Sequence, residues 1–362
     1  MLSKKQIHYL IIIAIIVVVI LALTLGLVLG LKKGKKETDD VEIVNSYDNT
    51  EELIKTYPVK NPVTVLDGLE KKIQNRLLTG FENWNRGYKA WKKWGNILYT
   101  DASIYNVNGV RLTLSQYQAA MDVTLKQTTI LLGDFHNMII CGNYTAIFYD
   151  DAHVRNGKRI NGTVMEFVSF KDYGSELGTR VVVGWGGTKG SSFNSMRVFQ
   201  GDHERMVQDE IINLLMNYQI PTEGTLKERY PILYPTEYLE KDKAEKIIDI
   251  ILQWFDEWNT DLDSYINWLN DGYTNDALSY GLEGEERNMK TYKDAMVALT
   301  ENKTIKKLYF DNILVRDNWA AIHYRYRIEY KETNQKEVGD RMQFLKFIEE
   351  GGNYKIQASW IK

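Results

Sequence analysis

Several residue types that mark particular classes of protein are scarce in this 362-residue sequence. A single cysteine, Cys141, excludes an internal disulfide and a cysteine-rich zinc or iron–sulfur site. The five histidines lie far apart without metal-site spacing, so we expect no metal. The glycine-rich stretch at 184–192 lacks the order of a phosphate-binding loop, and we expect no cofactor. The sequence has 45 basic and 48 acidic residues. This lack of a basic excess argues against nucleic-acid binding.

One long apolar run lies near the N-terminus. Residues 10–31 carry no charge, and as a helix they would span about 33 Å, enough to cross a hydrocarbon core of ~30 Å. A cleaved signal peptide would have a shorter apolar region that ends in small residues. We therefore expect residues 1–9 to be a tail and residues 10–31 to be a transmembrane helix that contacts membrane lipid. The protein would be a single-pass membrane protein, and the side of the membrane that its soluble part faces stays open.

Acidic residues dominate the segment after this run. Residues 37–54 hold seven acids and no base, a composition typical of a solvated chain. We expect residues 32–63 to form an acidic stalk.

Two parts of the remaining chain resemble each other at a nearly constant spacing. Residues 81–85 (FENWN) and 255–259 (FDEWN) lie 174 residues apart, and Trp94 matches Trp268 at the same spacing. Farther on the spacing is 175, as between Trp185 and Trp360. We interpret this pattern as two copies of one domain, at 64–200 and 240–362.

Residues 201–239 would link the two copies. The five prolines all lie before the first copy or in this linker, where neither helices nor central strands are needed. Apolar residues within 203–219 recur at helical spacing, which predicts an amphipathic helix.

Within each copy the hydrophobic period changes along the chain. Apolar residues at steps of three and four predict helices at the start, for example at Ile247, Ile251 and Phe255. Period-two alternation then predicts strands, most clearly at 319–330, where His323 falls on the charged face and is expected to point outward. The predicted fold class is α+β, with two tandem domains whose N-terminal helices pack on a curved antiparallel sheet.

This order of elements resembles the SnoaL-like branch of the nuclear-transport-factor-2-like superfamily. Residues 98–105 (LYTDASIY) are similar to its segment after the second helix, and residues 134–149 resemble its first long hairpin, with Gly142-Asn143 as the turn. The resemblance implies a cone-shaped fold with a pocket between sheet and helices. Family members include polyketide cyclases and isomerases, and many have no known activity.

The catalytic acid that the resemblance implies, shortly after a last-strand tryptophan, is absent from both copies. Trp185 is followed by Gly186, and Trp360 by Ile361. The remaining acid–base candidates are His136 and Asp101, although a strand-edge histidine and a turn aspartate explain them as well. Glu166 lies in a predicted strand without an evident partner.

Tyrosines recur in both copies and are candidates for the lining of an aromatic pocket, or alternatively for the filling of a core. They are Tyr99, Tyr105, Tyr117, Tyr149, Tyr273, Tyr280, Tyr292 and Tyr324.

Three functions stay open. The first is non-catalytic binding of a small apolar ligand or a protein partner, with the two domains paired through their sheets. The second is an isomerase-, cyclase- or dehydratase-like enzyme that abstracts a proton from a small apolar carbonyl compound in the first domain. The third is a structural spacer with sealed cores.

Overall fold

The computed structural model describes residues 41–107, 110–174, 179–187, 191–192 and 202–362, and residues 43–362 form one compact unit. The expected transmembrane helix at 10–31 lies outside the described residues. Within the described part, no helix is both long and apolar enough to cross a membrane.

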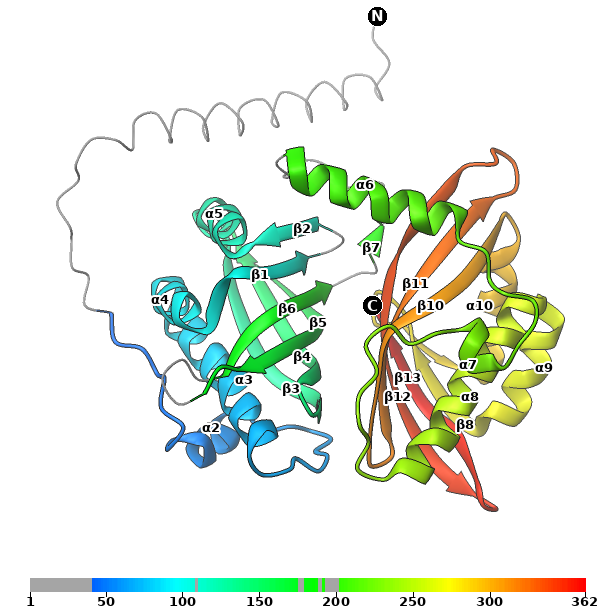
Figure 1. Ribbon diagram of the computed structural model, residues 1–362, viewed down its shortest axis with the longest axis horizontal. Helices are drawn as coiled ribbons and strands as arrows, with labels where there is room; N and C mark the ends of the chain where they lie inside the picture. The colour runs from blue at the N-terminus through cyan, green and yellow to red at the C-terminus, as the bar shows by residue number, and fades with distance from the viewer. Residues whose placement is uncertain (1–40, 108–109, 175–178, 188–190, 193–201) are drawn as a thin grey trace, which may run out of the picture. The chain divides into compact units, whose positions relative to one another are not determined.

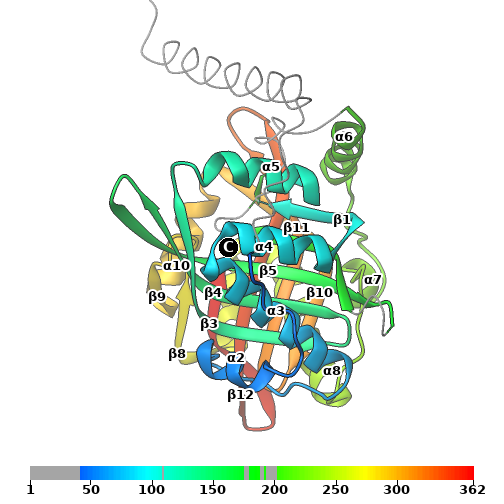
Figure 2. The ribbon, with the colours of Figure 1, turned by 90° about the vertical axis from the view of Figure 1, so that its left-hand side faces the viewer.

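The first sheet has six strands in the order β2-β1-β6-β5-β4-β3. Neighbouring strands are antiparallel except for the parallel pair β1–β6. Helices α3, α4 and α5 cover one face of this sheet (Figures 1 and 2). The elements are α3 (Leu69–Arg86), α4 (Tyr88–Leu98), β1 (Tyr99–Val107), β2 (Val110–Thr113), α5 (Leu114–Thr124), β3 (Thr129–Cys141), β4 (Tyr144–Arg155), β5 (Lys158–Asp172) and β6 (Thr179–Gly187).

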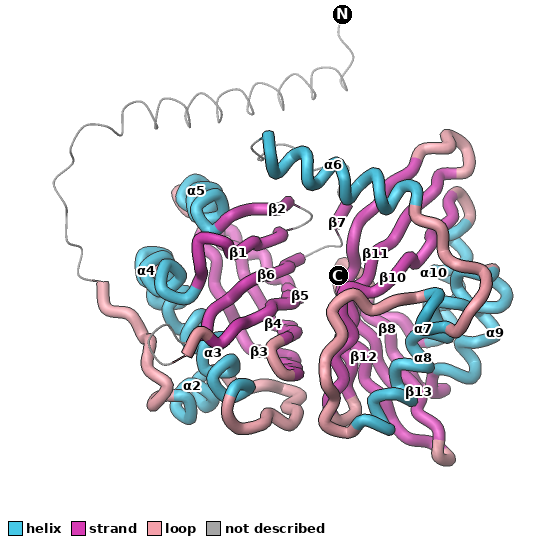
Figure 3. The backbone as a smooth tube through the Cα atoms, in the orientation of Figure 1, coloured by secondary structure: helices cyan, strands magenta, loops and turns pink. Residues whose placement is uncertain are grey.

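The second sheet repeats this order as β9-β8-β13-β12-β11-β10, again with one parallel pair, β8–β13. Its helices also lie on one face (Figure 3), and the short strand β7 (Ser191–Ser192) pairs with β12. The elements are α8 (Lys241–Thr260), α9 (Leu262–Gly272), β8 (Tyr273–Tyr280), β9 (Glu286–Asn288), α10 (Met289–Thr300), β10 (Lys303–Arg316), β11 (Trp319–Tyr330), β12 (Lys336–Glu350) and β13 (Asn353–Ile361). The expected α+β class, with helices on largely antiparallel sheets, is confirmed, but the parallel pair in each sheet was not predicted.

Local sequence explains how these elements begin and turn. Helix α5 begins at a capping box, in which Thr113 and Gln116 satisfy each other's backbone N–H groups. The predicted turn between β3 and β4 is confirmed: Cys141 pairs with Tyr144, which leaves Gly142-Asn143 as a two-residue loop with Gly142 at φ 59°. A positive φ costs glycine nothing, because it has no Cβ.

Part of the expected stalk belongs to the folded unit. Residues 50–56 form helix α2 (Thr50–Thr56), and Leu53 and Tyr57 are buried in the core of the first half. The Tyr57 hydroxyl donates to Glu82 Oε2 at 2.8 Å. The folded part therefore begins well before residue 63. The sequence did not indicate this, because acidic residues dominate the composition of the segment.

The expected linker at 201–239 is also structured. It contains helix α6 (Asp202–Asn217), which confirms the predicted amphipathic helix, and the short helix α7 (Leu226–Arg229). Ile212 and Leu215 of α6 are buried against residues of β10 and β12. Tyr230, after α7, is fully buried in the core of the second half.

The faces of the two sheets that carry no helices contribute to one buried apolar cluster. From the first sheet come Ile139, Cys141, Ala146, Phe148, Met165 and Phe167, and from the second come Leu314, Trp319, Ala321, Met342 and Phe344. The rings of Phe148 and Phe344 lie 5.7 Å apart. At β3, β4 and β5 of the first sheet and β10, β11 and β12 of the second, both faces are therefore covered, one by helices and the other by the opposite sheet.

His323 shows the consequence for the charged face of β11. It was expected to point outward, but its side chain is fully buried beside the Phe167 ring. Its Nε2 lies 2.6 Å from Asp340 Oδ2, and Arg325 pairs with Asp311 in the same group. The prediction was wrong because alternation separates the two faces of a strand without indicating that both will be covered.

An ion pair joins the two halves across this buried layer. Arg316 of β10 donates to Glu70 of α3 at 2.7 Å and to the carbonyl oxygen of Ile140 in β3, also at 2.7 Å. Glu70 also accepts hydrogen bonds from the backbone N–H groups of Leu66 and Gly142. The side chains of Arg316 and Glu70 are 2% and 5% exposed, so water screens this pair very little.

Candidate functional site

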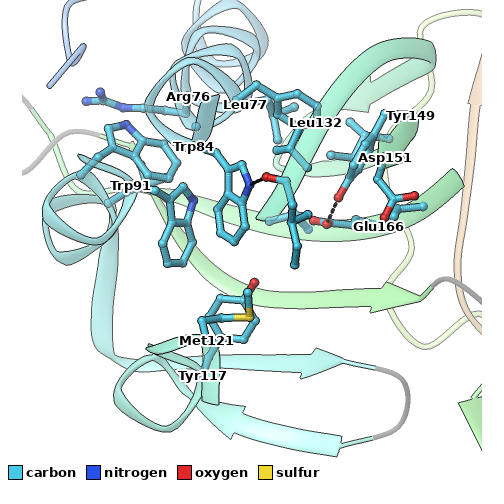
Figure 4. A pocket seen from close by; sticks show the side chains of 18 of the residues that line it. Arg76, Leu77, Trp84, Trp91, Tyr117, Met121, Leu132, Tyr149, Asp151 and Glu166 are labelled. Carbon is cyan, nitrogen blue, oxygen red and sulfur yellow. Dashed lines mark hydrogen bonds between the residues drawn. The ribbon is translucent and has the colours of Figure 1, made fainter. Parts of the chain in front are cut away.

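A cavity of 420 Å³ lies between the helices and the sheet of the first half (Figure 4). Most of its lining is apolar, with contributions from α3, α4, α5 and the inner face of the sheet. Eight aromatic side chains take part: Phe81, Trp84, Trp91, Trp94, Tyr99, Tyr117, Tyr149 and Phe170. This volume is within the range of pockets that hold small molecules.

Matching contacts relate the interior of this half to that of the second half. The Trp84 indole donates to the carbonyl of Ile130, and the Trp258 indole donates to the carbonyl of Ile305. The ring centroids of Phe81 and Tyr149 lie 4.7 Å apart, and those of Phe255 and Tyr324 lie 4.9 Å apart, each pair edge to face. Positions 174 apart in the helices and 175 apart in β3 and β4 are thus equivalent in geometry.

Two of these equivalent positions differ between the first half, which holds the cavity, and the second half. Gly80 occupies the place of Trp254, and Leu132 occupies the place of Lys307. Trp254 and Lys307 are both buried in the second half, and Lys307 Nζ lies 3.5 Å from the Trp254 ring centre. Gly80 and Leu132 instead line the cavity. The Trp94 ring packs directly against Gly80, whereas Leu132 is shorter than Lys307 and leaves space for the cavity.

A carboxylate and three tyrosines form one polar part of the cavity lining. Glu166 of β5 accepts a hydrogen bond of 2.6 Å from the Tyr149 hydroxyl (Figure 4). Burial, together with the nearby Glu166 charge, raises the pKa of Tyr99, Tyr117 and Tyr149. These hydroxyls thus stay protonated at neutral pH and serve as hydrogen-bond donors.

Three further ionisable groups line the cavity. The buried Asp151 carboxylate lies 2.7 Å from Nε2 of His153, whose side chain is 44% exposed. Arg76 is turned away from the centre in Figure 4, and its guanidinium donates to Asn45 and lies over the Tyr47 ring. Asp151 and Arg76 therefore have partners of their own, and Glu166 is the charged group that the Tyr149 hydroxyl contacts.

Seven of the eight predicted tyrosines fall into three groups. Tyr99, Tyr117 and Tyr149 line the cavity. Tyr273, Tyr292 and Tyr324 are buried in the filled core of the second half. Tyr280 lies away from that core, with its ring stacked on Trp360 at 5.2 Å.

The side chain of Tyr105 lies outside the described residues. The backbone ladder nevertheless corrects its expected match with Tyr280. Tyr280 pairs with Trp360, whereas the residue that pairs with Trp185 is Asn106.

Of the two acid–base candidates from the sequence, the structure describes the side chain of His136. His136 lies outside its lining, stacked on the Phe148 ring at 4.5 Å and hydrogen-bonded to Asp150 at 2.6 Å. The side chain of Asp101 lies outside the described residues. Sequence reasoning did not assign Glu166, Trp84 or Trp91 to a site, although the mismatches Gly80/Trp254 and Leu132/Lys307 in the repeat were a usable signal.

A larger hollow of 680 Å³ lies in the second half, where α8 meets α9 and β10 begins. Charged residues of both signs line it, among them Asp261, Glu301 and Lys303. Lys307 and the recurrent tyrosines are not part of its lining. This hollow is therefore not the equivalent of the aromatic cavity in the first half.

Comparison with known proteins gives matches of structure alone, since no family model and no curated protein matches the sequence. A proposed polyketide cyclase from Xanthomonas campestris pv. campestris is 11% identical, with 32% of this chain and 90% of that protein covered at a TM-score of 0.28. A proposed SnoaL-like polyketide cyclase from Jannaschia sp. CCS1 is 11% identical, with 34% and 89% covered at 0.28. An NTF2-like protein of unknown function from Pseudomonas putida KT2440 is 11% identical, with 34% and 89% covered at 0.27. The structural neighbours are thus SnoaL-like and NTF2-like proteins, and at these TM-scores they carry no argument about function.

Proposed function

We propose that the first half of the folded unit binds a small, largely apolar molecule in its aromatic cavity. The observation that carries this proposal is the 420 Å³ cavity, in which the Tyr149–Glu166 pair supplies polar contacts within an apolar wall. Pockets with a few polar groups in an apolar lining are typical of small-molecule sites. The interior of the second half is filled, and it serves as a structural partner.

The proposal includes the domain organisation. The chain would hold two copies of a SnoaL-like fold, behind a transmembrane helix at 10–31. Matching strand orders and the matching indole hydrogen bonds support the two copies. The copies would pair through their sheets as a pseudo-symmetric dimer, since Ile139 and Ala146 of one sheet and Leu314 and Ala321 of the other occupy equivalent positions in the shared cluster. Protease protection of the full chain in sealed vesicles would test the anchor and show which side the folded unit faces.

Binding is tested by titrating the full chain with a hydrophobic fluorescent dye and a small-molecule library. We expect ligands to compete with the dye in the wild type and Leu132→Phe to weaken binding, because a larger ring occupies the cavity. The matched control is Leu233→Phe, since Leu233 is 48% exposed and lies outside the cavity lining. Failure of every ligand to bind, or equal weakening by both substitutions, would refute the proposal.

An enzyme is the second candidate, and the position of Glu166 favours it. A carboxylate in a cavity can accept a proton from the carbon next to a carbonyl group, and a tyrosine hydroxyl can donate to the enolate oxygen that results. Glu166 would be the base, and Tyr99 or Tyr117 the donor. Turnover of cyclic ketones that is lost in Glu166→Gln while binding persists would establish catalysis. Absence of turnover in the wild type would leave binding as the function.

A further inference from the structure

We infer that the cavity of the first half binds an organic cation, namely a quaternary ammonium group on a small apolar body. This inference rests on the proposed ligand-binding function and specifies its ligand. In the second half, the equivalent surroundings hold an amino group of the protein itself, that of Lys307.

Lys307 of β10 ends inside a box of aromatic rings. Its Nζ lies 3.5 Å from the ring centre of Trp254, and 4.9, 4.7, 5.7 and 5.9 Å from those of Phe255, Trp258, Tyr265 and Tyr324. A cation within about 6 Å of an aromatic ring centre is attracted by the negative face of the ring. Within the described part of the chain, the amino group of Lys307 therefore lies among rings rather than carboxylates.

The first half keeps this box but not the lysine. Phe81, Trp84, Trp91 and Tyr149 stand where Phe255, Trp258, Tyr265 and Tyr324 stand, and all four line the cavity. Leu132 replaces Lys307, and Gly80 replaces Trp254, with the Trp94 ring packed against Gly80. The residues that surround an amino group in one half thus line a cavity in the other.

The first half also adds negative charge. Ile147 pairs with Glu166 across β4 and β5, and the equivalent Ile322 pairs with Gln343 across β11 and β12. A carboxylate therefore lines the cavity at a position where the second half has a neutral amide. The Glu166 charge lies within the same cavity as the ring faces of Trp84 and Trp91 (Figure 4). An aromatic wall with a carboxylate suits a ligand that is both apolar and positively charged.

A quaternary ammonium fits this site better than a primary amine. Burial lowers the pKa of Lys307, so a protonated amine in such surroundings is driven to lose its proton, although the ring faces oppose this loss. A quaternary nitrogen carries no proton and keeps its charge. It also donates no hydrogen bond, so ring faces and a counter-charge satisfy it fully.

The test compares two probes of nearly the same shape on the full chain. Benzyltrimethylammonium carries the charge, and 2,2-dimethylpropylbenzene has carbon in place of nitrogen. Binding is followed by tryptophan fluorescence and by calorimetry. We expect the cation to bind at least about tenfold more tightly than the neutral probe, because several ring faces and a carboxylate act together.

Three variants locate the effect. Leu132→Lys places a lysine where the second half has one, so its own ammonium should occupy the box and weaken binding of the cation by about tenfold or more. Leu132→Met is the matched control, with an unbranched chain and no charge, and should bind as the wild type does. Glu166→Gln should reduce the preference for the cation and leave binding of the neutral probe unchanged. Far-UV circular dichroism and thermal unfolding check that each variant is folded. If Leu132→Lys does not fold, the effect of Glu166→Gln on the preference for the cation decides between the outcomes.

The outcomes separate this inference from the proposed function. Equal binding of the two probes overturns the inference and leaves a small-molecule cavity. Binding of the dye or of library compounds without binding of the cation does the same. Absence of all binding overturns both. Retention of the cation preference in folded Glu166→Gln and Leu132→Lys variants would also overturn the inference.

Discussion

Substitution of Arg316 by methionine should destabilise the folded unit strongly, because it leaves Glu70 buried and charged. The pair spans 2.7 Å between side chains that are almost inaccessible to solvent. Removal of one partner of a buried ion pair costs about 3–5 kcal/mol. Glu70 keeps two backbone donors, at 2.9 and 3.0 Å, which place the expected loss near the lower limit, at about 3 kcal/mol.

The second substitution, Glu70→Gln, should have opposite effects in two backgrounds. In the wild type it should destabilise, since the Arg316 guanidinium then has no buried counter-charge. In Arg316→Met it should restore about 1–2 kcal/mol, because it removes the stranded charge and keeps one acceptor for a backbone N–H. This reversal of sign is the specific signature of a buried pair.

Equilibrium urea unfolding of the full chain, followed by circular dichroism and tryptophan fluorescence, measures these differences. The control is Lys290→Met, which breaks an exposed pair with Asp294 and should change the free energy of unfolding by less than about 0.5 kcal/mol. A loss below about 1 kcal/mol in Arg316→Met, or the same effect of Glu70→Gln in both backgrounds, would refute the reasoning.

Three further predictions concern buried and capping groups. Burial raises the pKa of Cys141 to about 11, so its thiol should resist Ellman's reagent in the native state at pH 8 and react in urea. Because the folded-state pKa is the higher one, this contribution to stability should be complete below about pH 8.5 and lost as the pH rises toward 11. Cys141→Ala should remove that part of the pH dependence in urea titrations. Lys307→Met should raise the free energy of unfolding at pH 7 by about 1–3 kcal/mol, because burial lowers the pKa of Lys307. The wild type loses stability as the pH falls below the unfolded pKa of lysine, so the gain should shrink toward pH 10 in urea titrations, and a gain that is constant with pH would contradict this account. Thr113→Ala should cost about 1 kcal/mol in thermal unfolding through loss of the α5 cap, and an unchanged melting temperature would show that the cap contributes nothing.

The sequence predicted the helices and long strands well, because each has a clear period. The apolar spacing around Ile251 and Phe255 and the alternation at 319–330 correspond to α8 and β11. Parallel pairing of β1 with β6 could not be predicted, since the hydrophobic pattern of one strand does not identify its neighbour. The burial of His323 was missed for a related reason, because a charged face can be covered when Asp340 and Asp311 pair with its charges.

The candidate site was only partly accessible from the sequence. The recurrence of Tyr117 and Tyr149 indicated aromatic positions that line the cavity. The role of Glu166 depends on the register of β4 against β5, which brings its carboxylate to the Tyr149 hydroxyl. Register follows from long-range packing and turns rather than from composition. The sequence nevertheless indicated that the two interiors differ, because equivalent positions 80 and 254, and 132 and 307, hold side chains of different size.

The apolar layer between the two sheets has a consequence during synthesis. Phe148 is covered in part by Phe344 and Phe167 by His323, residues that the ribosome adds more than 150 positions later. At typical translation rates this interval lasts roughly 10–35 s, while a sheet of about 100 residues collapses within a millisecond. The apolar face of the first sheet is thus exposed to solvent until the second half has been synthesised. A chaperone that shields β4 and β5 at this stage would suppress aggregation of the growing chain.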